Sequence, residues 1–420
     1  MPATPSPRSL EDWLRWQESL NPRGIALGLE RVGHVAERLS LRRSGVPTLT
    51  VAGTNGKGST STLSALILRE AGFQVGLYTS PHLLRYNERV QLHGSPVDDA
   101  SLCRAFAAIE AVRGEIPLTY FEFGTLAALW LFREAAVDVQ VLEVGLGGRL
   151  DAVNWVDADV AVVTNVGLDH QDWLGVDREA IGREKAGVFR RQCPAVIAER
   201  APPHSVLSVA RDVGARALQL GVDYDYREQA GRWCWQAGAA CIGDLPPPGL
   251  TGPMQLQNAA AAITAVRSLD LPVNDDAIRR ALPAVRLPGR LERRQTHDGD
   301  VLLDVAHNAE AMAVLAAHLD RLDAHPVVAI LGMLADKPVA EAAAYLAPRV
   351  ERALLIDLPG PRGLLATELA ARIAGSGLNA QCCDNMRAAL QQAHAMAGPG
   401  GLVVVTGSFL TVAEAVAAIA

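Results

Sequence analysis

The sequence lacks an excess of positive charge and any C-x-x-C motif. Its 39 basic residues are outnumbered by 46 acidic ones, so the formal net charge is −7. Nucleic acid and anionic membrane attract basic surfaces, so neither is an expected partner. The six cysteines form no regular framework, which favours a reduced, cytoplasmic protein over a disulfide-bonded one.

The sequence also lacks a long apolar run. The strongest candidate, Val327–Leu334, falls far short of the ~18 residues that a membrane helix needs. The first residues show no charged segment followed by an apolar core, so we expect no signal peptide. Hydrophobic residues are 49% and charged residues 20% of the chain, a composition typical of folded globular proteins. A length of 420 residues predicts roughly two to three domains.

Apolar runs alternate with amphipathic stretches along the chain, which predicts an α/β fold. Buried strands separated by helices indicate a parallel sheet covered on both faces. In the first part, the expected strands are Thr48–Ala52, Gln74–Thr79, Asp138–Val144 and Asp159–Asn165, and the expected helices are Ser59–Ala71, Asp99–Arg113, Phe123–Ala135 and Leu256–Leu269. In the last part, the expected strands are Val301–Val305, Val327–Leu331, Ala353–Ile356 and Leu402–Thr406.

Two segments interrupt this alternation. Val222–Ile242, rich in Trp and Gly, predicts antiparallel strands at the edge of the sheet, and the basic segment Arg286–Arg294 predicts a hinge between domains. We therefore expect a P-loop parallel-sheet ATPase domain over residues 1–288. A smaller Rossmann-like α/β domain is expected over residues 289–420.

The strongest local signal is the glycine-rich segment Val51–Thr60, which follows a strand and opens a helix. In that context glycines let backbone N–H groups approach phosphate oxygens, and the helix N-terminus adds its positive dipole end. Lys57 would reach the β- and γ-phosphates, and Ser59 or Thr60 would supply a hydroxyl to Mg²⁺. The spacing departs from the usual P-loop because Gly58 follows the lysine, and a glycine turn feeding a helix is the plainer alternative. The expected phosphate contacts are Thr54, Asn55, Gly56, Lys57, Gly58, Ser59 and Thr60.

Polar residues follow three of the expected strands: Ser80, Glu143 and His170. Open α/β sheets bind ligands at the carboxyl ends of their strands. Glu143 could alternatively cap a helix or pair with Arg149, and His170 and Ser80 could be structural hydrogen-bonding groups. Beside a phosphate loop, metal binding is the better interpretation of the set. Lys185, in the last turn of a short predicted helix, would by itself only complement the helix dipole.

Taken together, these residues resemble the bacterial dihydrofolate synthase/folylpolyglutamate synthase family of the Mur ligase superfamily. The similarity extends over nearly the whole chain and is weakest over residues 200–250. The GKG form of the loop is the family's own. The matching segments are Gly28–Arg31, Gly53–Thr60, Ser80–His82, Leu118–Glu122, Leu142–Asp151, Asp169–His170, Gly182–Gly187, Pro288–Arg290, Asp304–Asn308 and Thr406–Phe409.

The resemblance implies an ATP-dependent amide ligase. A carboxylate, either of dihydropteroate or the γ-carboxylate of a tetrahydrofolate glutamate, accepts the γ-phosphoryl group, and the amino group of L-glutamate attacks the acyl phosphate. Lys57, His170 and Lys185 would be catalytic. The family pattern implies one Mg²⁺ on Ser80 and Glu143 and a second metal site with Glu143 and His170, with K⁺ as a further candidate ion. It implies an N6-carboxylated lysine at Lys185.

The resemblance also implies further contacts with the nucleotide and with glutamate. Asn258, Arg290 and Asp304 would bind the nucleotide, and an arginine on the hinge would reach phosphates only when the domains close. His307 and Ser408 would place the incoming glutamate, with His307 as a catalytic residue. Oligomeric state follows only from the resemblance, which suggests a monomer.

A pteroate site is expected at two further segments. They are Thr119, Tyr120, Phe121 and Glu122 in one, and Leu150, Asp151 and Ala152 in the other. An aromatic ring would stack on a flat pterin and an acid would accept its hydrogen bonds. The plainer alternative places Phe121 in the core and makes Glu122 a helix cap.

Several other functions share parts of this pattern. A folate-only polyglutamate synthase would lack the pteroate reaction. A peptidoglycan ligase would need an additional N-terminal domain, for which there is no room before Gly53. A P-loop kinase would consume no glutamate. A non-catalytic nucleotide switch would leave the strand-end acids unexplained.

Overall fold

The computed structural model describes residues 9–21, 25–43, 45–322, 324–360 and 362–419. The chain divides into two units. The first takes in the chain up to Gly249 together with Leu256–Val285, and the second contains Leu250–Gln255 and the chain from Arg286 onward. The short segment Leu250–Gln255 therefore groups with the later part of the chain, although it lies well before residue 289. No helix within the described ranges is long and apolar enough to cross a membrane.

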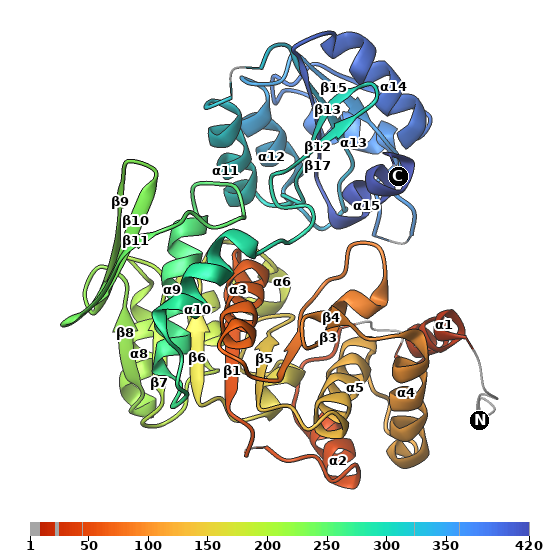
Figure 1. The fold of residues 1–420 in the computed structure, drawn as a ribbon. Coiled ribbons are helices and arrows are strands. Elements are labelled where there is room, and N and C mark those ends of the chain that lie inside the picture. The colour runs from red at the N-terminus through yellow and green to blue at the C-terminus, as the bar shows by residue number, and fades with distance from the viewer. Residues whose placement is uncertain (1–8, 22–24, 44, 323, 361, 420) are drawn as a thin grey trace. The chain divides into compact units, whose positions relative to one another are not determined.

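The first unit is built on an eight-stranded sheet in the order β4-β3-β2-β5-β1-β6-β7-β8 (Figure 1). All neighbouring strands are parallel except β3, which pairs antiparallel with β2 and with β4. The four central strands are buried along their whole length, as expected for a sheet covered on both faces. The strands are β1 (Thr48–Ala52), β2 (Val75–Tyr78), β3 (Val90–Leu92), β4 (Ser95–Pro96), β5 (Val139–Glu143), β6 (Val160–Val163), β7 (Pro194–Ile197) and β8 (Arg216–Gln219).

Helices cover this sheet, and one of them begins earlier than the sequence pattern predicts. The predicted helix Phe123–Ala135 begins at Tyr120, because Thr119 and Glu122 form a capping box. The helices are α1 (Leu10–Leu20), α2 (Glu30–Arg38), α3 (Lys57–Glu70), α4 (Asp99–Arg113), α5 (Tyr120–Glu134), α6 (Gln171–Leu174), α7 (Arg178–Ala186), α8 (His204–Val213), α9 (Gln255–Ser268) and α10 (Asp275–Ala284), with 3₁₀ turns η1 (Tyr86–Arg89) and η2 (Ala152–Trp155).

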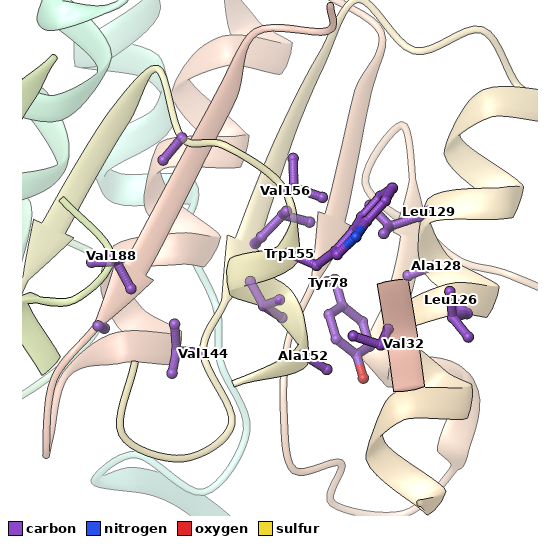
Figure 2. Close-up of a cluster of buried hydrophobic side chains, with 14 of the residues drawn as sticks. Val32, Tyr78, Leu126, Ala128, Leu129, Val144, Ala152, Trp155, Val156 and Val188 are labelled. Atoms are coloured by element: carbon purple, nitrogen blue, oxygen red, sulfur yellow. The ribbon is translucent and has the colours of Figure 1, made fainter. Parts of the chain in front are cut away.

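The core of the first unit lies between the sheet and these helices. Figure 2 shows Tyr78 and Trp155 near Val32 and Leu126 in one buried cluster. Phe132 of α5 packs so closely on β2 that a Cβ on Gly76 would lie 2.7 Å from its ring. This contact between a large ring and a glycine fixes how closely α5 approaches the sheet.

The Trp- and Gly-rich segment forms a separate sheet, not an edge of the main one. β9 (Tyr224–Gln229), β10 (Arg232–Ala237) and β11 (Ala240–Leu245) pair antiparallel in a three-stranded sheet. The prediction of antiparallel strands is confirmed, but their placement at the edge of the parallel sheet was wrong. Trp235 explains the difference, because its Nε1 donates to Thr264 Oγ1 of α9 at 2.9 Å and anchors the small sheet there.

The second unit contains a six-stranded sheet in the order β12-β13-β17-β14-β15-β16, with only β12 antiparallel. Part of the predicted hinge is ordered as strand β12, because Glu292–Thr296 pairs with β13. The strands are β12 (Glu292–Thr296), β13 (Gly299–Leu303), β14 (Val327–Leu331), β15 (Arg352–Leu355), β16 (Ala380–Cys382) and β17 (Leu402–Thr406), and the helices are α11 (Ala309–Leu319), α12 (Val339–Leu346), α13 (Ala366–Ile373), α14 (Met386–Ala397) and α15 (Phe409–Ile419).

The packing of Phe132 gives a stability prediction. Phe132→Ala should lower the free energy of unfolding of the first unit by about 3–5 kcal/mol, because it leaves a cavity against β2. All seven tryptophans lie in that unit, so urea unfolding followed by tryptophan fluorescence reports on it alone. Val222→Ala, at a side chain that is 73% exposed, is the control and should change stability by less than about 0.5 kcal/mol. Equal effects of the two variants would contradict this account of the core.

Candidate active site

The register of the central strands aligns the loops that follow them. Val51 of β1 lies opposite Glu143 of β5, and Tyr78 of β2 lies opposite Leu142. Ala52 lies opposite Val163 of β6. The carboxyl ends of β2, β5, β1 and β6 therefore lie side by side, as expected for the binding edge of an open α/β sheet.

The glycine-rich loop has the backbone conformation that only glycine adopts easily. Gly53 has φ +148° and Gly56 has φ +83° immediately before α3. A Cβ on Gly53 would lie 1.8 Å from Thr164 Oγ1, so the loop lies directly on the segment that follows β6. A Cβ on Gly56 would lie 2.5 Å from Asn258 Oδ1, which places the predicted nucleotide contact on α9 against the loop.

Several hydrogen bonds hold this loop to the segment after β6, and three of them involve Thr164 or Asn165. The Thr54 N–H donates to Asn165 O at 2.9 Å, and the Asn55 N–H donates to Asn165 Oδ1 at 2.8 Å. The Thr164 hydroxyl donates to Asn55 O at 2.6 Å. The sequence analysis missed Thr164 and Asn165, since no motif marks a residue that acts by holding another loop. Together they fix the loop conformation before any ligand binds.

Two lysines from distant parts of the sequence meet at one carbonyl group. Lys57 Nζ donates to Gly53 O and to Thr54 O at 3.1 Å each. Lys185 Nζ, from the last turn of α7, donates to the same Gly53 O at 2.9 Å. Lys185 is 4% exposed, so it is not the solvent-facing lysine that its place in a helix end suggested. The loop thus carries two converging ammonium groups, of which that of Lys57 is half-buried and that of Lys185 is buried.

The carboxylate of Glu143 lies buried at the end of β5, beside the segment that follows β2. The Ser80 N–H donates to Glu143 Oε2 at 3.1 Å. Arg149 forms its ion pair with Glu184, at 2.8 Å, and not with Glu143 as the plainer alternative suggested. Ser59 is also buried, in the first turn of α3. A carboxylate with neighbouring serines supplies the oxygen ligands that Mg²⁺ prefers.

His170 lies in the loop after β6 in the left-handed conformation, with φ 52°. Its Nε2 is 3.9 Å from Asp169 Oδ2, and its side chain is 33% exposed. Within the described part of the chain, no group of three or more His, Cys, Asp or Glu side chains has the arrangement of a metal site. The metal sites expected from the sequence are not groups of this type, because each would combine one or two such side chains with hydroxyl and phosphate oxygens.

The Leu118–Glu122 segment begins α5, and Glu122 has the capping role named as its alternative. The Thr119 N–H donates to Glu122 Oε2 at 2.7 Å, and the Glu122 N–H donates to Thr119 Oγ1 at 3.2 Å. Arg31 pairs with the same carboxylate at 3.0 Å. A contact of Glu122 with a pterin stays a prediction, as does one of Tyr120, whose ring packs edge-on against Tyr86.

Phe121 and Asp151 both lie against the glycine-rich turn that follows β5. A Cβ on Gly145 would lie 2.5 Å from the ring of Phe121. Asp151, between Leu150 and Ala152, accepts hydrogen bonds from the N–H groups of Leu146 at 2.8 Å and Val153 at 3.0 Å. Burial raises the pKa of Asp151 to about 7, although these hydrogen bonds and the charge of Lys57 act in the opposite direction. The two predicted pteroate segments therefore meet at one turn.

The predicted residues of the second unit gather at the ends of β13 and β17. The guanidinium of Arg290 lies 4.9 Å from the centre of the Phe409 ring, and the His307 ring lies 6.2 Å from it. Ser408, which precedes that ring, accepts a hydrogen bond from the Thr411 N–H at 3.0 Å. Asp304 accepts from the Leu291 and Ala306 N–H groups, at 2.8 and 2.9 Å. Burial raises the pKa of this carboxyl group.

Comparisons with known proteins agree with this arrangement. A family model described as the Mur ligase middle domain matches residues 51–266, and one described as the Mur ligase glutamate ligase domain matches residues 289–409. The dihydrofolate synthase/folylpolyglutamate synthase of Escherichia coli strain K12 is 44% identical over 406 residues, which are 96% of this chain and 94% of that protein.

Solved structures show the same similarity. The E. coli FolC in complex with DHPP and ADP has a TM-score of 0.94 at 43% identity and covers 99% of both chains. A bifunctional folylpolyglutamate synthase/dihydrofolate synthase with Mn, AMPPNP and L-glutamate bound has a TM-score of 0.91 at 45% identity, again over 99% of both chains.

This chain belongs to the dihydrofolate synthase/folylpolyglutamate synthase family of Mur ligases. It is an ATP-dependent ligase with the α/β fold of that family, a parallel-sheet first unit and a separate C-terminal α/β sheet. The resemblance seen in the sequence motifs is thereby confirmed. The role of each site residue stays a prediction.

The contact at Gly53 predicts a loss of nucleotide binding by this family member. Gly53→Ala would place a methyl group on Thr164 and strain a backbone at φ +148°. We expect ATP affinity to fall roughly tenfold or more, since such strain costs of order 1–3 kcal/mol. Calorimetric titration with a non-hydrolysable ATP analogue measures it. Gly243→Ala, where no atom lies within 4 Å, is the matched control, and an unchanged affinity in the Gly53 variant would contradict the loop geometry.

The raised pKa of Asp151 predicts a pH-dependent stability. Its folded-state pKa of about 7 lies above the ordinary aspartate value of 3.8, so folding favours the protonated form. The contribution is complete below pH ~4 and is lost as the pH rises through ~7. The unfolding free energy of the wild type minus that of Asp151→Asn should fall by roughly 2–4 kcal/mol between pH 4 and 8. Urea unfolding by tryptophan fluorescence measures both, and a pH-independent difference would contradict the assignment.

Proposed function

We propose that this enzyme adds L-glutamate to dihydropteroate, forming dihydrofolate, and to the γ-carboxylate of tetrahydrofolate, forming polyglutamates. The main support is the strand-end arrangement, in which the phosphate loop, Lys57, Lys185 and Glu143 converge beside the Phe121 and Asp151 turn. The E. coli relative bound to DHPP and ADP, and the relative bound to Mn, AMPPNP and L-glutamate, support the same substrates.

In the first step, a carboxylate oxygen of the acceptor attacks the γ-phosphorus of ATP. The bond from that phosphorus to the β,γ-bridging oxygen breaks, ADP leaves and an acyl phosphate remains. Such a transfer depends mainly on positioning and on stabilising negative charge. Residues Thr54 to Thr60 and the N-terminus of α3 would hold the phosphates, and Lys57 would exchange its bonds to Gly53 O and Thr54 O for phosphate oxygens. Asn258 would contact the nucleotide beside the loop.

In the second step, the amino nitrogen of L-glutamate attacks the acyl carbon, and the bond from that carbon to the phosphate oxygen breaks. The nitrogen loses a proton as the amide forms, so the amine must arrive neutral or meet a base. His307 and Ser408 would place the glutamate, and Arg290 and Asp304 would contact the nucleotide. Their support is the gathering of His307, Arg290 and Phe409 at the strand ends of the second unit.

The residues at the strand ends fit divalent metal ions. Ser59, Ser80 and Glu143 offer oxygen ligands, and His170 offers an imidazole. When bound, Mg²⁺ would neutralise charge on the γ-phosphate and the acyl phosphate. We propose two Mg²⁺ sites, one on Ser80 and Glu143 and one involving Glu143 and His170, and a K⁺ ion as a further candidate. The buried Glu143 supports the first site, because its carboxylate already contacts the Ser80 backbone.

We propose that the pteroate acceptor lies at the turn after β5. Phe121 would stack on the pterin, Asp151 would accept or share its hydrogen bonds, and Thr119, Tyr120, Glu122, Leu150 and Ala152 would complete the pocket. A carboxyl group with a pKa of about 7 is suited to a pterin because it can bind either as a donor or as an acceptor at neutral pH. We further propose that the enzyme acts as a monomer in the cytoplasm.

The direct test measures ADP release and product mass with each acceptor, with and without L-glutamate. We expect ADP release to require acceptor, glutamate and Mg²⁺, with one glutamyl unit added per ATP. Turnover of tetrahydrofolate alone would favour a folate-only polyglutamate synthase. An acceptor that gains phosphate but no glutamate would indicate a kinase. ADP release without any acceptor would favour a nucleotide switch.

The proposed metal role of Glu143 predicts a catalytic defect. Glu143→Ala should lower kcat by roughly 10²-fold or more, with a much smaller change in ATP affinity, because the metal is needed most as charge moves onto the leaving phosphate. Steady-state kinetics and nucleotide titration separate the two effects. Glu134→Ala, which removes a carboxylate with a half-exposed side chain, is the control. A near-normal kcat for Glu143→Ala would return Glu143 to a structural role.

The paired lysines predict that Lys185 is carboxylated in the active enzyme. Reaction of its neutral amine with CO₂ forms a carbamate and releases a proton, which replaces a second buried cation beside Lys57 with an anion. Enzyme equilibrated with ¹³C-bicarbonate should show a carbamate carbon resonance that Lys185→Arg lacks. Lys185→Ala should be nearly inactive and partly restored by a short carboxylic acid, whereas Lys185→Arg should not be restored. A wild-type spectrum without that resonance would contradict the prediction.

A further inference from the structure

A single arginine lies between two tyrosine rings at the entrance of α5. The guanidinium carbon of Arg89, in η1, is 5.3 Å from the centre of the Tyr86 ring and 5.6 Å from that of Tyr120. The two rings meet at 89°. Arg89 Nε donates to His82 Nδ1 at 2.9 Å. Three neighbouring side chains therefore fix the plane of the guanidinium group.

This cation has no acidic partner among the described residues. Glu88, its neighbour in the chain, uses its two carboxylate oxygens on the N–H groups of Leu83, Leu84 and Arg85. Asp99 binds Arg85 and the Asn87 amide. By contrast, Arg31 pairs with Glu122 nearby. A half-buried guanidinium fixed by neutral groups alone leaves its two terminal nitrogens without an acidic partner among the described residues, and the ligand that matches them is a carboxylate or phosphate.

The position of Arg89 favours a carboxylate of the acceptor over a phosphate. Its carbonyl oxygen accepts from the Thr79 N–H, one residue before Ser80, so it lies at the same edge of the sheet as Glu143. Its guanidinium lies against the ring of Tyr120, a residue of the predicted pteroate segment. Tyr78, which is paired with the next residue of the chain, Val90, has its ring 5.9 Å from that of Phe121. Arg89 therefore lies on the acceptor side of the site.

The two proposed acceptors differ by one carboxylate on this side. Dihydropteroate has a single carboxylate, which the reaction consumes. A folate has two on its terminal glutamate: the γ-carboxylate reacts, and the α-carboxylate stays negative throughout. On the basis of the proposed function, we propose that Arg89 binds this α-carboxylate and so determines the use of glutamylated acceptors. His82 is the residue that positions Arg89.

His82 is suited to that positioning role. An arginine can only donate, so His82 Nδ1 must accept and its proton must lie on Nε2. An imidazole that accepts at Nδ1 and carries its single proton on Nε2 is neutral. A neutral acceptor holds the guanidinium without neutralising it, which a carboxylate at this position would not do.

The test pairs a variant with a substrate analogue. The analogue is tetrahydrofolate whose α-carboxylate is converted to an amide and whose γ-carboxylate is free. Calorimetry in the presence of a non-hydrolysable ATP analogue should show that Arg89→Gln weakens binding of tetrahydrofolate roughly 10²-fold, the range for loss of one partner of a buried charge pair. The wild type should bind the α-amide more weakly than tetrahydrofolate by about the same factor. Arg89→Gln should bind the α-amide and tetrahydrofolate with nearly equal affinity.

Kinetics give a second measurement. For Arg89→Gln, the rise in KM for tetrahydrofolate should exceed that for dihydropteroate at least tenfold, with kcat changed less than KM. Arg85→Gln, which removes an exposed neighbouring arginine, is the matched control. His82→Leu should raise the KM for tetrahydrofolate in the same way, but less than Arg89→Gln does. His82→Asn keeps an acceptor near the Nδ1 position, so its KM for tetrahydrofolate should lie close to that of the wild type.

Three results would overturn the proposal. One is an equal loss with both acceptors, which would assign Arg89 to the reacting phosphate or to stability. Another is a wild type that binds tetrahydrofolate no more tightly than its α-amide. The third is an Arg89→Gln variant that still discriminates the amide, because the α-carboxylate would then bind elsewhere. Failure of the proposed function gives a different result, since glutamate would be added to neither acceptor whatever the binding measurements show.

Discussion

The close approach of the glycine-rich loop to the segment after β6 is the constraint on which the first-unit site depends. Gly53 lies so near Thr164 that no side chain fits between them, and Asn165 holds the next two residues of the loop. The carbonyl of Gly53 is thereby fixed as the common acceptor of Lys57 and Lys185. The loop is preorganised for phosphate by neighbouring backbone, so a ligand would not have to order it.

Charged groups gather around this loop. Two ammonium groups donate to one carbonyl oxygen, and the carboxylate of Glu143 accepts from the Ser80 N–H. Arg89 is held by rings and a neutral imidazole. Removing charged groups from water costs free energy, and ligands of opposite charge would recover part of it. Sites that bind ATP, metal and anionic acceptors are where this cost is expected.

Much of the fold could be predicted because its strands are continuous apolar runs. Thr48–Ala52, Val327–Leu331 and Leu402–Thr406 have the predicted bounds, since each is a fully buried run without a charged residue. Helix α5 was predicted to start three residues late, because a capping box depends on a side chain folding back onto the backbone. The small sheet β9-β11 was misplaced, because its position is set by Trp235 contacting α9.

The sequence by itself determined the α/β class, the phosphate loop, the strand-end acids and the family. These depend on local periodicity and on motifs whose chemistry is carried by neighbouring residues in the chain. Only the tertiary structure decided that Lys185 is buried on Gly53 O and that Phe121 lies on the turn after β5. It also decided that Arg89 has two aromatic neighbours and no acid. Each of these facts depends on packing between segments distant in sequence, whose distances no local pattern records.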